Sequence, residues 1–249
     1  MKAKDIEKDL KKICETVSMD LVSIQWENTN VRISEQESRV LFCNAIEKEY
    51  NKKFYYAIEV PTEEKYNFTE NPRVDPKGRS ACSDLSLFRS NSNSDNRKFK
   101  QIVNIEFKAH NNVAVLDIMK DLLKLAAEPV HGLFLHTLKN INRGTLINTG
   151  RNMGVMDKYR KIKEYKKVLN KSIEEGGKFI LFAICIIESQ VLLMKTLRKS
   201  DLNSIDEFFS IDYEKIRENN LSGNNKNWEQ KNLYKRKNGQ RLIFPAYKN

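Results

Sequence analysis

Apolar residues recur along this chain with two spacings, one typical of helices and the other of strands. Positions 3–18 carry apolar side chains three and four residues apart, and so do positions 34–50, where Glu37 follows Ser34 by three residues. This spacing predicts two amphipathic helices, and a serine followed by such a glutamate has the form of a capping box. Residues 19–33 lack the regularity, and we expect a loop or short strands there.

Short runs rich in β-branched and aromatic residues predict the strands. Residues 54–60 form one such run, which we expect to stop at Pro61 because proline cannot donate to a sheet ladder. Runs 83–88 and 102–108 alternate apolar and polar positions, and the polar stretch 89–100 between them predicts that they pair as a hairpin. Further strands are predicted at 132–138, 179–187 and 190–197, helices at 117–128 and 155–173, and loops at 65–78 and 140–154.

This order of elements predicts an α/β fold with a central mixed β-sheet flanked by helices. We expect an N-terminal helical extension (1–33), a core (34–200) and a basic, aromatic C-terminal extension (201–249), in which 202–219 is predicted as helical. The longest apolar run, Phe179–Ile187, is too short to cross a bilayer, so no contact with a membrane is expected. The scattered cysteines and the lack of a secretory signal predict a cytoplasmic protein.

The two alternating runs also carry the residues with the most evident chemistry. In the second run, Glu106 and Lys108 would lie on one face of the strand, and Ile105 and Phe107 on the other. Pairing of the runs would bring Asp84 beside Glu106, so that two carboxylates and an ammonium group could meet one metal ion and one water. An ion pair on the surface of a strand is the alternative interpretation.

An acid on one strand followed by acid-x-lysine on the next resembles the PD-(D/E)XK nuclease superfamily. Here the two parts are Asp84 and the tripeptide Glu106–Lys108, and residues 34–129 follow the helix–strand–strand–strand–helix order of that family. Ser83 stands where the family pattern has proline. The resemblance implies that the predicted α/β core is restriction-endonuclease-like.

The resemblance also implies how such a site works. Mg²⁺, or Mn²⁺ in its place, would be held by Asp84, Glu106 and the main-chain carbonyl of Phe107, while Lys108 would orient or help deprotonate the attacking water. A further catalytic acid on the first core helix often completes such sites. Glu37 matches the family layout better than Glu47, although a capping role for Glu37 is equally open.

Positive charge is concentrated in two segments of the chain. The net charge is +11; residues 150–171 carry eight basic and two acidic side chains, and residues 221–249 carry seven and one. This pattern predicts a polyanionic partner such as a nucleic acid, with a merely solvated lysine-rich face as the alternative. The resemblance to the nuclease superfamily implies that the nucleic acid is DNA rather than RNA. The candidate nucleic-acid-binding residues are Arg143, Arg151, Lys158, Lys161, Lys163, Lys166, Lys167, Trp228, Lys231, Tyr234, Lys235, Arg236 and Lys237.

Together these features predict a metal-dependent endonuclease that hydrolyses phosphodiester bonds of DNA, in restriction, phage defence or repair. A homodimer would explain cleavage of both strands. Two other interpretations stay open: a catalytically inert nucleic-acid-binding module or subunit of a nucleoprotein complex, and a subunit whose basic faces meet an acidic protein. The chain has no phosphate-binding loop, no dinucleotide fingerprint and no Ser-His-Asp or Cys-His signature, which argues against ATP-driven or covalent chemistry.

Overall fold

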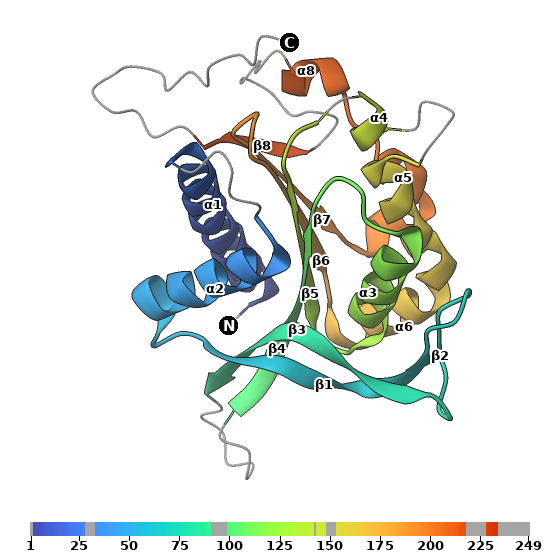
Figure 1. The fold of residues 1–249 in the computed structure, drawn as a ribbon. Coiled ribbons are helices and arrows are strands. Elements are labelled where there is room, and N and C mark those ends of the chain that lie inside the picture. Colours follow the sequence, from blue (N-terminus) through green and yellow to red (C-terminus); the bar gives the residue numbers. More distant parts are fainter. Residues whose placement is uncertain are drawn as a thin grey trace.

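The computed structural model describes residues 2–27, 33–90, 99–141, 143–147, 153–217 and 228–233. They form an α/β structure in which helices cover both faces of one mixed, eight-stranded β-sheet (Figure 1). The predicted fold class is confirmed at this level. Among the described residues, no helix is long and apolar enough to span a membrane.

Parallel pairing is confined to the centre of the sheet. In spatial order the strands are β2 (Arg73–Val74), β1 (Tyr55–Asn67), β3 (Arg79–Ser90), β4 (Phe99–Ala109), β5 (His131–Leu138), β6 (Ile180–Ile186), β7 (Val191–Leu197) and β8 (Glu229–Asn232). β4 pairs in parallel with β5, and β5 with β6, whereas the other neighbouring strands are antiparallel. The parallel connections pass through helices, as such crossovers require.

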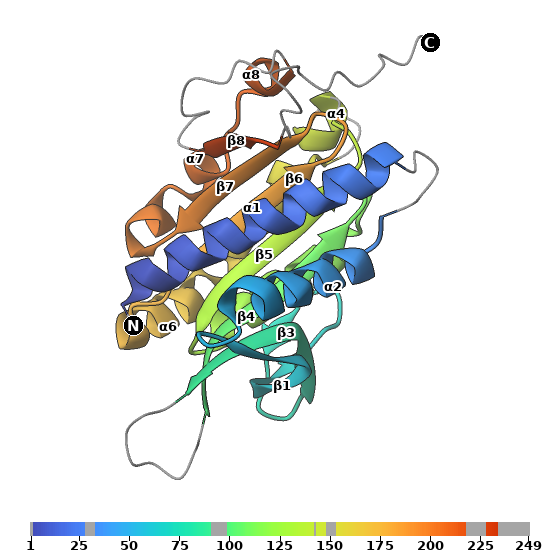
Figure 2. The ribbon, with the colours of Figure 1, turned by 90° about the vertical axis from the view of Figure 1, so that its left-hand side faces the viewer.

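The helices form two layers, one on each face of the sheet. They are α1 (Ala3–Glu27), α2 (Glu35–Ala45), α3 (Val115–Ala127), α4 (Arg143–Leu146), α5 (Val155–Arg160), α6 (Lys166–Gly176), α7 (Ile205–Phe208) and α8 (Tyr213–Arg217), with the π-helical turn η1 (Ile46–Tyr50) and the 3-10 turns η2 (Lys161–Tyr165) and η3 (Lys199–Asn203). α1 and α2 lie across one face, and α3, α5 and α6 cover the other (Figures 1 and 2).

Each face of the sheet has its own apolar core. Ile105 and Phe107 of β4 pack on the side of α1 and α2, where Leu10 and Phe42 are fully buried. Phe134 of β5 packs on the other side, with α3 and α5. β6 is buried at every position because helices cover both of its faces, and this explains its uninterrupted apolar sequence.

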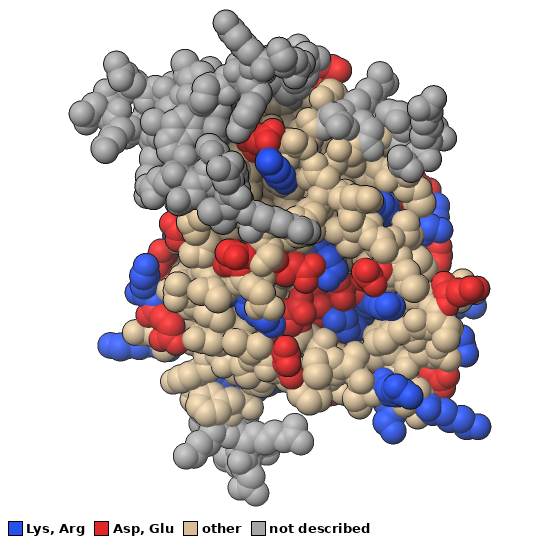
Figure 3. All heavy atoms as spheres, viewed as in Figure 1, with Lys and Arg blue, Asp and Glu red and all other residues tan. Residues whose placement is uncertain are grey.

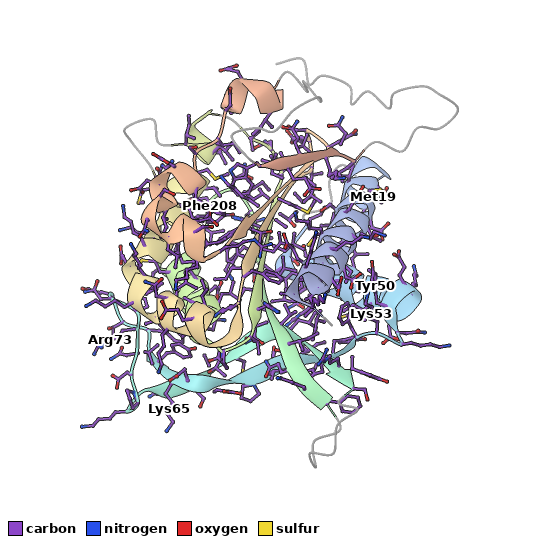
Figure 4. The ribbon with its side chains drawn as sticks, turned by 180° about the vertical axis from the view of Figure 1, so that it is seen from behind. Met19, Tyr50, Lys53, Lys65, Arg73 and Phe208 are labelled. Carbon is purple, nitrogen blue, oxygen red and sulfur yellow. The ribbon has the colours of Figure 1, made fainter. Side chains whose placement is uncertain are left out.

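An ion pair joins the end of the α2 segment to α1. Lys53 follows the π-helical turn, and its Nζ lies 2.5 Å from Oδ2 of Asp9. Tyr50, the last residue of that turn, stacks on Phe54 with ring centroids 5.8 Å apart. Figure 4 shows Tyr50 and Lys53 beside α1, so both helices are tied together where the chain enters β1.

The N-terminal helix is longer than expected. α1 runs to Glu27, so the expected loop or short strands from residue 19 onward are wrong as far as residue 27. Leu21 and Val22 continue the helical apolar stripe and are buried. Buried apolar positions therefore sustain the helix through a stretch whose spacing alone did not predict it.

β1 does not stop at the proline. It continues to Asn67, with Pro61 opposite Cys82 of β3, and the register of the pair shifts between Pro61 and Lys65. Such an irregularity accommodates a residue without an N–H. The segment expected to be a loop from residue 65 therefore holds the end of β1, which begins this stretch at Lys65, and the short strand β2, whose Arg73 pairs with Asn67 (Lys65 and Arg73 are labelled in Figure 4).

The long basic helix is interrupted. Residues 155–173 form α5, the 3-10 turn η2 and most of α6, although the predicted apolar stripe from Tyr159 to Leu169 is buried. The region from residue 202 holds part of η3 and the short helices α7 and α8 instead of one helix. Beyond it, Trp228 is buried in the core and β8 completes the sheet edge, so part of the C-terminal extension packs on the central sheet.

Candidate active site

The pairing of β3 with β4 places the two predicted strand acids next to each other. The strands are antiparallel with Leu85 opposite Ile105, so Asp84 lies level with Glu106. The peptide N–H of Phe107 donates to Asp84 Oδ2 over 2.8 Å. The prediction that the hairpin brings Asp84 beside Glu106 is confirmed.

Glu106 is fully buried between the sheet and α3. Its Oε2 lies 2.6 Å from Nζ of Lys124, while its Oε1 has no hydrogen-bond partner among the described residues. Burial raises the pKa of Glu106 well above its usual range; the Lys124 ammonium opposes this shift, and the carboxylates of Asp121 and Asp84 add to it. A carboxylate in this setting depends on a neighbouring cation to stay ionised.

Two residues of α3 that sequence reasoning missed complete the cluster. Asp121 Oδ2 lies 2.8 Å from Lys108 Nζ, and Asp121 Oδ1 lies 3.1 Å from Lys124 Nζ, so one carboxylate bridges both lysines. Asp121 and Lys124 are buried, with 6% and 8% of their surface exposed. The sequence does contain a signal for them: Asp121 and Lys124 have opposite charges, lie three residues apart, and fall on the apolar face of the predicted helix beside Ile118 and Leu122.

Lys108 lies at the open end of the cluster. Its Nζ also lies 3.4 Å from Glu35 Oε1 at the start of α2 and 3.2 Å from the main-chain oxygen of Phe107. Burial alone would lower the pKa of Lys108, but Asp121 and then Glu35 and Asp84 raise it above its usual value. Lys108 is therefore a charged group at neutral pH, suited to contact an anion rather than to accept a proton.

The first core helix contributes a different acid from the expected one. Glu37 Oε2 accepts from the N–H of Ser34 over 2.7 Å and also from its hydroxyl, which is the capping box. Glu35, two residues earlier, is the acid that contacts Lys108. Glu47 is exposed at the far end of the α2 segment. The structure thus places Glu37 in its capping role and brings neither Glu37 nor Glu47 into contact with Lys108.

Two of the predicted nucleic-acid-binding residues that the structure describes lie in the interior. Lys158 is buried, and its Nζ donates to the main-chain oxygen of Val113 over 2.7 Å; Trp228 is fully buried. Neither side chain is presented to a ligand. Lys161, Lys163 and Lys166 contact Glu164, Asp206 and Asn203, Lys167 is exposed, and Lys231 lies 3.6 Å from Glu229. Outside the described residues lie Arg151, Tyr234, Lys235, Arg236 and Lys237, together with the side chain of Arg143.

Acidic and basic side chains meet on one face of the molecule. Figure 3 shows red and blue groups gathered in the middle of this view, between the positions of α2 and α3 in Figure 1. Glu35 is a partly exposed member of the cluster, with 45% of its side chain accessible, whereas Lys108 has 12%. The cluster therefore reaches from a buried carboxylate to the surface through Lys108 and Glu35.

The donor atoms of the cluster fit a magnesium ion in number and type. Within the described parts of the chain, no group of three or more His, Cys, Asp or Glu side chains is arranged to hold a metal. Mg²⁺ needs fewer protein ligands, because one or two carboxylates hold it and water and substrate phosphate complete its octahedral coordination. Asp84 and Glu106 supply such a pair, and Glu106 Oε1, which none of the described residues donates to, is an acceptor that a cation would satisfy.

Comparison with known proteins adds no relative. No protein-family model, curated protein or solved structure matches the chain. What the molecule offers for interpretation is its own geometry: an adjacent carboxylate pair on two strands and two lysines bridged by a third carboxylate.

Proposed function

We propose that this chain is a metal-dependent nuclease that hydrolyses phosphodiester bonds of DNA, built on a restriction-endonuclease-like core. One observation carries the proposal. The buried Glu106 carboxylate has an oxygen without a donor in the described part of the chain, and it lies level with Asp84 on the neighbouring strand, with Lys108 two residues further on. Two carboxylates and a lysine in this arrangement match what phosphodiester hydrolysis requires of an enzyme.

Each residue has a distinct role in this proposal. Asp84 and Glu106 would hold Mg²⁺, or Mn²⁺, which when bound neutralises phosphate charge and lowers the pKa of bound water. The main-chain oxygen of Phe107, the third ligand that the resemblance implies, accepts a hydrogen bond from Lys108 over 3.2 Å and would exchange that bond for the metal ion. Lys108 stays protonated beside Asp121 and would stabilise the negative charge that develops on phosphate oxygens during attack.

The choice of a nucleic acid as substrate rests on charge, and the choice of DNA rests on the resemblance to the nuclease superfamily. The chain has a net charge of +11, and a polyanion is the partner that such an excess attracts. In the same proposal the protein is cytoplasmic, acts in restriction, phage defence or repair, and pairs as a homodimer to cut both strands. Lys167 is an exposed member of the basic segment and is the described residue best suited to test phosphate contact.

A catalytically inert nucleic-acid-binding module is the second candidate. It is favoured by Lys124, whose ammonium lies 2.6 Å from Glu106 and partly neutralises that carboxylate without any metal. The two candidates differ in one measurable property. A nuclease needs a divalent cation at Asp84 and Glu106, whereas a binding module needs only its basic surface.

Cleavage assays separate these candidates. Plasmid, linear and single-stranded DNA, and RNA, are incubated with Mg²⁺, Mn²⁺ or EDTA. We expect metal-dependent cutting of DNA that falls at least about 100-fold in Asp84→Asn, Glu106→Gln and Lys108→Met. Lys120→Met is the matched control, because Lys120 lies on the outer side of α3, paired with Asp117, and its loss should leave cutting unchanged.

The opposite outcome is equally clear. A wild-type protein that cuts none of these substrates, and whose Mn²⁺ binding is the same in Glu106→Gln, refutes the nuclease proposal. Binding of DNA that weakens steeply with salt would then support the binding module. Binding that is indifferent to salt would point away from nucleic acid altogether.

A further inference from the structure

The ammonium group of Lys124 is surrounded by oxygen atoms from three separate elements. Its Nζ lies 2.6 Å from Glu106 Oε2 on β4, 3.0 Å from the main-chain oxygen of Cys82 on β3 and 3.1 Å from Asp121 Oδ1 on its own helix. Lys124 itself is only 8% exposed. A side-chain cation therefore fills a buried position lined by two carboxylates and a carbonyl, which is a ligand set that a hard metal ion also prefers.

Glu106 links this position to the proposed metal. One of its oxygens, Oε2, contacts the Lys124 ammonium, and the other, Oε1, has no hydrogen-bond partner among the described residues. In two-metal nuclease sites the ions lie about 3.5–4 Å apart, so one carboxylate can bridge them. In Glu106 the Lys124 ammonium contacts one carboxylate oxygen, where one of the two metal ions would be, and the other oxygen, which lacks a donor among the described residues, is available to the proposed metal ion.

We propose that the Lys124 ammonium takes the place of a second metal ion, so that this site binds a single divalent cation per chain. The inference rests on the proposed nuclease function and makes it more specific: the enzyme is a one-metal nuclease with a built-in second cation. Asp121 is then a positioning residue, because its two oxygens hold Lys124 and Lys108 apart at fixed places.

The test counts metal ions rather than catalytic turnovers. Mn²⁺ binding is titrated by calorimetry and by electron paramagnetic resonance on wild type, Lys124→Met and the control Lys120→Met. We expect one ion in wild type and in the control, and two in Lys124→Met, because three oxygens lose their ammonium partner. Adding Asp121→Asn to Lys124→Met should remove the second ion again.

Each result distinguishes this inference from the nuclease proposal itself. If wild type binds one ion and Lys124→Met binds no more than one, or if wild type already binds two, the inference is refuted and a nuclease remains tenable. If wild type binds none and Lys124→Met binds one, the ammonium does occupy a cation position, but the metal-dependent nuclease is refuted. If neither binds Mn²⁺, both proposals fail.

A folding defect does not prevent a decision. Lys124→Met leaves the buried Glu106 without its ammonium, so the variant is expected to be unstable in EDTA. Circular dichroism then replaces calorimetry as the readout. Recovery of the native spectrum on addition of Mn²⁺, with no such effect of Mn²⁺ on Lys120→Met, supports the inference, and a failure of Mn²⁺ to restore structure refutes it.

Discussion

Glu128 should be one of the most important residues for the stability of this fold. It directly follows α3, is only 2% exposed, and accepts three hydrogen bonds from the bulged part of β1. These come from the N–H of Glu63 at 3.0 Å, the N–H of Glu64 at 3.2 Å and the hydroxyl of Tyr66 at 2.7 Å. One carboxylate thus holds the irregular end of β1 against the helix that carries the site.

The cost of Glu128→Gln can be estimated from these contacts. An amide has one accepting oxygen in place of two, so at least one donor, the part-buried N–H of Glu63 if the amide keeps its better orientation, loses its acceptor. A donor without an acceptor costs about 1–3 kcal/mol when it is fully buried and less when water can reach it, and the remaining bonds weaken when the acceptor is neutral. We expect the free energy of unfolding to fall by about 1–3 kcal/mol.

Urea unfolding followed by circular dichroism measures this change. The midpoint should fall while the slope with denaturant stays the same, since the surface exposed on unfolding is unchanged. A double-mutant cycle with Tyr66→Phe should give a coupling energy of about 1 kcal/mol or more, because the two side chains are in direct contact. Glu64→Gln is the control, since its side chain is exposed.

The estimate has a definite failing result. A loss of less than about 0.5 kcal/mol in Glu128→Gln, equal to that of Glu64→Gln, would show that the carboxylate does not hold β1 in solution. Additive effects of Glu128→Gln and Tyr66→Phe would contradict the hydrogen bond between the two side chains.

Three further predictions concern residues outside the metal cluster. Trp228→Ala should destabilise the protein by about 3–5 kcal/mol in urea, because the indole is fully buried, and should leave DNA affinity at fixed salt unchanged; a folded variant with weaker binding would contradict this. Ser34→Ala should lower the free energy of unfolding, measured by thermal denaturation, by about 1 kcal/mol and leave nuclease activity within twofold of wild type. A larger loss of activity would show that Glu37 contributes to the active site. Burial lowers the pKa of Lys178 from 10.5 to about 7, so the unfolded chain binds more protons than the folded one between about pH 7 and pH 10.5. Wild-type stability should therefore rise by up to about 1.4 kcal/mol per pH unit across that range and not in Lys178→Met; an equal rise in Lys178→Met would disprove this assignment.

The part of the site that lies on neighbouring strands could be predicted from the sequence. Alternation along a strand is a local property, so Glu106 and Lys108 had to share a face once the strand formed. The short polar connection made pairing with the preceding strand the simplest arrangement, and this brought Asp84 to Glu106. The alternation of side chains along a strand and the short distance in sequence between the two strands were sufficient to predict how these three residues are arranged.

The contribution of α3 could not be predicted in the same way. Asp121 and Lys124 reach Glu106 because α3 packs on β4, and no local pattern specifies which turn of a crossover helix lies over which strand residue. Glu35 and Glu37 show a related limit. Both are within the first turn of α2, and only the direction in which the helix approaches β4 decides that Glu35 contacts Lys108 while Glu37 caps.

Composition likewise did not distinguish residues of the surface from residues of the core. Cations interleaved with aromatics around Trp228 suggested stacking on a nucleic acid, but the indole is buried against Phe208 and Phe209 at the β7 edge of the sheet. Figure 4 shows Phe208 in this region, far from Lys65 and Arg73. An aromatic side chain can stack on a base or pack in a protein core equally well, and the residues that bury Trp228 are distant from it in sequence. The local sequence therefore could not decide between the two.

By itself, then, the sequence determined the class of fold, most helices and strands, the face of each strand and the pairing of Asp84 with Glu106. Those features follow from side-chain periodicity and from hydrogen bonds between nearby segments, which act over a few residues. The tertiary structure alone decided that Lys124 would neutralise Glu106 and that Asp121 would bridge two lysines. Such contacts depend on how a helix is seated on a sheet, which is set by the packing of the whole core rather than by any local pattern.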